Sequence, residues 1–85
     1  MRYIVGKENI HKFGERSVEL QDTETGMSYR LHSRKNGKYY NATPNNDRAE
    51  TLRFYRIDGD TGHHIDGIDL NDLISGLESG DIKIR

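Results

Sequence analysis

Residues 17–31 read SVELQDTETGMSYRL, two runs of alternating apolar and polar residues on either side of a polar turn. Val18 and Leu20 fall on one face of the first run, and the alternation continues through Leu31 in the second. Between the runs, Gly26 can adopt a positive φ because it has no Cβ atom to clash. This pattern predicts an antiparallel β-hairpin, from which the remaining elements are assigned outward.

A second hairpin turn is predicted at residues 36–37, because Asn-Gly pairs favour the type I′ turn, in which both residues have positive φ. This turn joins the preceding strand to a strand over residues 38–43. Pro44 should end that strand because proline cannot donate a ladder hydrogen bond. A further strand is expected over residues 51–58, followed by a Gly-rich turn.

The N-terminal segment is expected to contain a short strand over residues 2–6. Residues 7–15 are mostly polar, but Ile10 and Phe13 lie three positions apart, which is the spacing of one helical turn. We therefore expect a loop with one helical turn here. The apolar run at the start is too short for a signal peptide or a membrane span.

One helix is predicted late in the chain, with Asp69 as its N-cap. Apolar residues recur behind it with helical spacing, at Leu70, Leu73, Ile74 and Leu77. Gly80 should stop the helix, and residues 81–85 should form the last strand. A short strand over residues 63–68 is also expected before the helix.

The expected fold class is therefore α+β and mostly β, in a single domain over residues 1–85. It is either a curled antiparallel sheet or a small, partly open barrel, with one C-terminal helix before the last strand. The chain has no cysteine, which excludes disulfides and thiolate metal sites and favours a cytoplasmic protein. A thin core and exposed strand edges also allow a homodimer.

Charge is unevenly distributed along the chain. Residues 1–56 hold 11 Lys and Arg against 7 Asp and Glu, whereas residues 57–85 hold 2 against 7. Such asymmetry favours an electrostatic partner. Our leading hypothesis is a non-catalytic protein-binding module, an inhibitor or regulator of a larger protein that offers a basic groove. Its predicted contact residues are Asp58, Asp60, Asp66, Asp69, Asp72 and Glu78. The alternative interpretation is a solvated surface, in which these residues form turns and helix caps.

The runner-up hypothesis is nucleic-acid binding through the basic and aromatic hairpin over residues 29–40. Its cations would contact phosphates while its tyrosines stack on bases. The predicted residues are Arg30, Arg34, Lys35, Lys38, Tyr39 and Tyr40, and the competing interpretation is a solvated strand face with a core tyrosine. The near-neutral net charge of −1 argues against a dedicated nucleic-acid binder.

Catalytic and metal motifs are absent from the sequence, so no cofactor and no enzymatic function are predicted. Residues 58–62 begin like a calcium loop but depart from the EF-hand pattern at its fifth, sixth and twelfth positions. A third hypothesis, a small RNase, would combine a histidine with Glu50 and Arg53. The chain is similar in size and economy to accessory proteins of phages and mobile elements, a likeness that rests on no shared motif.

Overall fold

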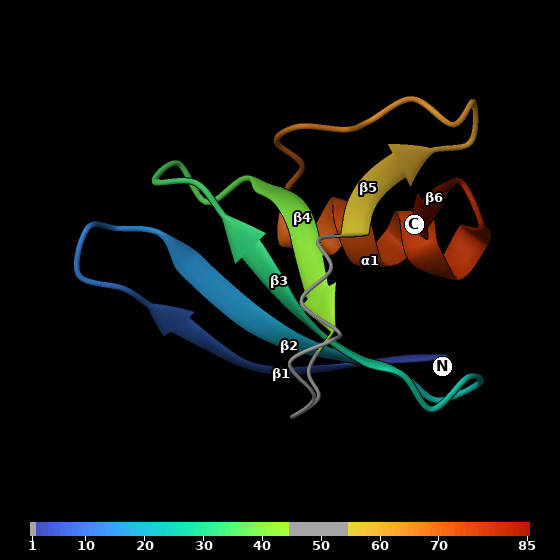
Figure 1. Cartoon of the computed structure of the whole chain (residues 1–85), viewed down its shortest axis with the longest axis horizontal. Coiled ribbons are helices and arrows are strands. Elements are labelled where there is room, and N and C mark those ends of the chain that lie inside the picture. The colour runs from blue at the N-terminus through green and yellow to red at the C-terminus, as the bar shows by residue number, and fades with distance from the viewer. Residues whose placement is uncertain (1, 45–54) are drawn as a thin grey trace.

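The computed structural model describes residues 2–44 and 55–85. The elements in these ranges are β1 (Tyr3–Ile10), β2 (Arg16–Asp22), β3 (Ser28–Ser33), β4 (Tyr39–Pro44), β5 (Tyr55–Gly59), α1 (Leu70–Ser79) and β6 (Ile82–Ile84). The strands form an antiparallel sheet in chain order (Figure 1). Its first and last strands do not pair, so the sheet is open and the predicted mostly-β fold with a late helix is confirmed in that form.

The hairpin predicted from residues 17–31 is confirmed in both position and register. Val18 lies opposite Leu31, and Leu20 lies opposite Tyr29. Gly26 has a φ of 76°, and its N–H donates to the carbonyl of Asp22 at 2.8 Å. The side chains of Val18, Leu20 and Leu31 therefore share the buried face of the sheet.

The core lies where α1 packs against β6 and the start of β1. Leu73 and Leu77 are the buried residues of the helix. They join one cluster with buried residues from all six strands, namely Tyr3, Val18, Leu20, Leu31, Tyr39, Ala42, Ile57 and Ile82. Full burial of a large apolar side chain contributes roughly 1.5–3 kcal/mol, so this cluster holds the sheet and helix together.

The loop predicted over residues 7–15 is wrong. β1 continues to Ile10, and only residues 11–15 form the connection to β2. The spacing of Ile10 and Phe13 suggested a helical turn, but their side chains are 69% and 68% exposed. A bulge between Val5 and Glu8 shifts the β1 register, which weakened the alternation that marks a strand.

The type I′ turn predicted at Asn36-Gly37 is also wrong, although a hairpin connection does form there. Gly37 has a φ of 78°, but no described non-glycine residue has a positive φ, so Asn36 stays outside the left-handed region. The N–H of Gly37 donates to the carbonyl of Arg34 at 2.9 Å, and the N–H of Arg34 donates to the carbonyl of Lys38 at 3.0 Å. This is the three-residue loop with a bulge at glycine, the next most common hairpin connection.

Helix α1 begins after Asp69, as predicted, but the Asp69 side chain makes no capping hydrogen bond. Its carboxylate instead accepts a hydrogen bond from Nζ of Lys38 at 2.8 Å. The strand predicted over residues 63–68 is replaced by two isolated bridges, Asp58 with His64 and Tyr39 with Ile68. The first part of the strand predicted over residues 51–58 lies outside the described residues.

Candidate functional site

Two neighbouring connections form one end of the sheet, residues 11–15 and 34–38, which we call the loop end. Both are three-residue loops closed by the same pair of backbone hydrogen bonds, with Gly14 and Gly37 at the bulge position. The loops contact each other, since a Cβ atom placed on Gly14 would lie 3.8 Å from Cγ of Lys35. The two connections therefore lie side by side, with the same backbone hydrogen-bonding pattern.

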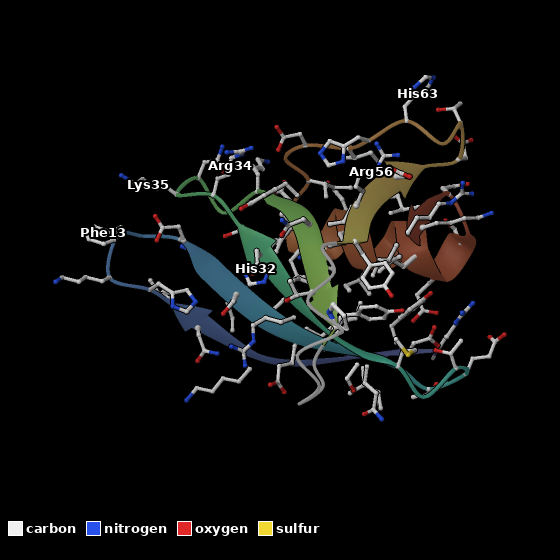
Figure 2. All side chains as sticks on the ribbon, in the orientation of Figure 1. Phe13, His32, Arg34, Lys35, Arg56 and His63 are labelled. Atoms are coloured by element: carbon white, nitrogen blue, oxygen red, sulfur yellow. The ribbon has the colours of Figure 1, made fainter. Side chains whose placement is uncertain are left out.

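The loop end carries an exposed aromatic ring among cations. Figure 2 shows Phe13, Arg34 and Lys35 projecting at this end of the molecule. The guanidinium of Arg34 lies 4.5 Å from the ring centroid of Tyr40, within the range of a cation–π contact. An open hollow of about 480 Å³ lies beside this stack, lined by Glu15, Ser33, Arg34, Lys35, Asn36 and Tyr40.

The six residues predicted for nucleic-acid binding separate into three groups. Arg34, Lys35 and Tyr40 line the hollow at the loop end. Lys38 and Arg30 are engaged elsewhere, with Lys38 bound to Asp69 and Arg30 lying 3.6 Å from a carboxylate oxygen of Glu19.

Tyr39 is a core residue, so its ring is enclosed by protein and cannot stack on a base. Its hydroxyl donates to a carboxylate oxygen of Glu8 at 3.2 Å. Burial, with a smaller contribution from Glu8, raises the pKa of Tyr39 to about 12. This outcome matches the alternative reading of a core tyrosine.

The predicted acidic surface is largely engaged by the chain itself. Asp66 accepts two hydrogen bonds from the guanidinium of Arg34, at 3.2 and 3.4 Å, and Asp69 binds Lys38. Glu78 accepts the backbone N–H of Tyr3 at 3.2 Å. The opposite charges that separate along the sequence therefore partly neutralise each other in space.

The remaining three predicted acids differ in exposure. Asp58 is only 1% exposed, and one of its oxygens lies 3.2 Å from Nη2 of Arg56 while the other has no hydrogen-bond partner among the described residues. A buried side chain of this kind cannot contact a partner directly. Asp60 and Asp72 are exposed and form no ion pair within the described ranges.

The histidines are engaged locally or exposed. Nε2 of His11 lies 2.8 Å from the Ser17 hydroxyl, and Nε2 of His32 lies 3.0 Å from the Thr43 hydroxyl. Burial, with smaller effects of Arg30 and His11, lowers the pKa of His32. Within residues 2–44 and 55–85, no group of three potential metal-ligating side chains is close enough to hold an ion.

The side chains of His63 and His64 are exposed. Glu50 and Arg53, the other two groups of the RNase hypothesis, lie outside the described residues, so that hypothesis stays untested.

Sequence reasoning missed the exposed position of Phe13 at the tip of the 11–15 connection. A usable signal was present, because HKFGE at residues 11–15 and RKNGK at residues 34–38 share lysine at the second position and glycine at the fourth. That shared pattern predicts the same connection twice. An aromatic ring just before the glycine would then be expected at an exposed loop tip.

Comparisons with known proteins give no family model, no curated protein and no solved structure that matches this chain. Among the described residues, no helix has both the length and the apolar character needed to cross a membrane.

Proposed function

We propose that this chain is a non-catalytic protein-binding module, a regulator or inhibitor of a larger protein, and that its contact surface is the loop end. The observation that carries the proposal is the exposure of Phe13, a large apolar ring held at the tip of a tight loop. Aromatic residues are frequent anchors of protein interfaces. Ile10, at the end of β1, is also an exposed apolar residue.

The residues around Phe13 have the composition of an interface rather than of a general surface. Aromatic residues and arginine are enriched at protein interfaces, and Arg34 stacked on Tyr40 supplies both. Lys12 and Lys35 have no anionic partner among the described residues. The complementary surface on a partner would hold an apolar recess for Phe13, surrounded by carboxylates.

The acidic surface that the sequence suggested is a weaker candidate. Asp66, Asp69 and Glu78 already have partners within the chain, and Asp58 is buried. Docking that surface onto a basic groove would first break these contacts, and the released cations would then repel the same groove.

The test is affinity capture from a nuclease-treated lysate of the source organism, using the tagged chain and two double variants. Phe13→Ser with Lys35→Glu alters the loop end, and Asp60→Lys with Asp72→Lys alters the two free acidic positions. Truncation of an interface anchor costs about 2 kcal/mol or more, which is over tenfold in affinity. We therefore expect the loop-end variant to lose the captured protein and the acidic variant to retain it.

The captured protein is then purified and titrated against the parent and both variants by calorimetry. This excludes capture that is mediated by a third protein. Equal affinity of the parent and the loop-end variant would reject this surface. Loss of affinity in the acidic variant alone would restore the acidic surface. No retained protein in any arm would count against a stable protein partner.

Nucleic-acid binding is the second candidate, because the hollow at the loop end places Arg34 and Lys35 beside the Tyr40 ring. Fluorescence anisotropy with labelled single-stranded oligonucleotides, titrated at several salt concentrations, tests it. Each phosphate contact adds about 0.7 to the slope of log affinity against log salt for single strands. Arg34→Ala with Lys35→Ala should reduce the slope by about one to two, and an unchanged slope would reject this candidate.

A further inference from the structure

A second concave surface lies at the opposite end of the sheet from the loop end. It is bounded by the start of β1, the β2–β3 turn, and the segment from the end of α1 to β6, which Figure 1 shows on one side of the molecule around the N and C labels. Its volume is about 440 Å³. We call it the seam pocket, because it lies beside the gap where β1 and β6 fail to pair. Pockets of about 300–1,000 Å³ are typical of small-molecule sites.

The base of the seam pocket is apolar. Its lining includes Tyr3, Tyr29, Leu77, Ile82 and Ile84, of which Tyr3, Leu77 and Ile82 are buried core residues. The Tyr29 ring is fixed by an edge-on contact with Tyr55, with the ring centroids 5.8 Å apart. The base is therefore a preformed surface for an apolar or aromatic group.

The rim of the seam pocket is cationic. Three residues with cationic side chains are among those that line it, Arg2, Lys83 and Arg85, and Asp22 is the one acidic side chain among them. That carboxylate is occupied, since it accepts two hydrogen bonds of 2.9 Å from Arg2. The Arg2 hydrogen bonds lower the pKa of Asp22 to about 2, so this pair stays ionised at neutral pH.

Lys83 and Arg85 have side chains without an anionic partner among the described residues. The pocket thus combines an apolar base with two cationic side chains that form no ion pair with the described residues. We infer that the seam pocket binds a small organic anion, with an aromatic or aliphatic body on the Tyr3–Tyr29–Ile82 base and an acidic head group at Lys83 and Arg85. This site is separate from the loop end and does not depend on the function proposed for it.

The probe is 1-anilinonaphthalene-8-sulfonate, which joins an aromatic body to one sulfonate. Titration of the folded chain should give a saturable rise in fluorescence with a Kd on the order of 100 µM, as expected for a few good contacts in an open pocket. Amide chemical shifts from ¹⁵N-labelled protein locate the probe. We expect shifts at Arg2, Thr25, Gly80 and Lys83, with residues 11–15 and 34–38 unchanged.

Charge-reversal variants separate this site from general attraction to a cation. Lys83→Glu with Arg85→Glu should weaken probe binding about fivefold or more, because two favourable charges become repulsive. The matched control is Lys12→Glu with Lys35→Glu, which changes the net charge equally at the other end and should leave the Kd unchanged. The uncharged analogue N-phenyl-1-naphthylamine should bind both variants equally.

Several outcomes would overturn the inference. One is the absence of saturable fluorescence, and another is an equal Kd for the two charge-reversal variants. Probe-induced shifts centred on the loop end would assign the probe to a different surface. Concentration-dependent shifts of the seam-pocket amides without probe would show that a second copy of the chain occupies the pocket.

A folding control accompanies these titrations. Cooperative thermal unfolding, followed by near-ultraviolet circular dichroism, ensures that the probe reports on the folded chain.

Discussion

The two ends of the sheet each hold a two-pronged Arg–Asp pair, and the pairs differ in burial. At the seam pocket, Arg2 binds Asp22 through two contacts of 2.9 Å, and the Asp22 side chain is 6% exposed. At the loop end, Arg34 binds Asp66 at 3.2 and 3.4 Å, and the Asp66 side chain is 50% exposed. The first pair is part of the packed fold, whereas the second can exchange its carboxylate for one on a partner.

The largest expected effect separates these two environments directly. Asp22→Ala removes the carboxylate that Arg2, Glu24 N–H and Thr25 N–H share, and we expect the free energy of unfolding to fall by about 2–3 kcal/mol. Asp60→Ala is the matched control, because Asp60 is an exposed turn residue whose side chain forms no hydrogen bond or ion pair with the described residues. It should stay within about 0.5 kcal/mol of the parent. Urea unfolding measures both, and equal losses would refute the contrast.

The second prediction concerns packing behind the seam pocket. Alanine usually stabilises a helix relative to glycine by up to about 1 kcal/mol. Gly76 is an exception, because a Cβ atom there would overlap Cδ1 of Ile82 and lie 2.5 Å from its Cγ1. We therefore expect Gly76→Ala to destabilise the chain by about 1–3 kcal/mol in thermal or urea unfolding. The double variant Gly76→Ala with Ile82→Val should recover part of the loss, and a stabilised single variant would contradict this packing.

A structural feature can be predicted from the sequence when the residues that form it are close together in the chain. The 17–31 hairpin follows from alternation and a glycine turn, because both signals lie within adjacent residues. β1 was recognised only in part, since an exposed edge strand with a bulge has few buried positions to create alternation. The Arg34–Asp66 pair joins residues 32 positions apart, so neither the pairing nor the engaged acidic surface follows from local patterns.

The site was harder to predict than the fold for the same reason. Opposite charges in the two halves of the sequence suggested an external partner, but several of these charges meet within the molecule. The spacing of Ile10 and Phe13 predicted a loop with one helical turn, because spacing alone cannot distinguish a helical turn from an exposed loop tip. The seam pocket brings together both ends of the described chain, which only the tertiary structure makes neighbours.

The third prediction uses pH to sharpen the contrast. The pKa of Asp22 is lowered to about 2 from a usual value of 3.8, chiefly by the hydrogen bonds from Arg2. Folding therefore favours the ionised Asp22 carboxylate. The stability that this carboxylate contributes to the folded chain is present above pH 4 and is lost as pH falls from 4 to about 2. The stability difference between the parent and Asp22→Asn should narrow across that range. A difference that stays constant from pH 6 to 2 would show that Asp22 titrates normally.

The smallest expected effect is at the loop end, where Asp66→Asn removes an exposed ion pair. Because both partners are about half exposed, we expect the free energy of unfolding to change by less than about 0.5 kcal/mol. Any loss measured at low salt should disappear in 1 M NaCl, where the Debye length is about 3 Å. A loss above about 1 kcal/mol that persists in high salt would show that Arg34 is held by the fold. Arg34 would then be less able to bind a carboxylate of a partner, because breaking its contact with Asp66 would cost that same free energy.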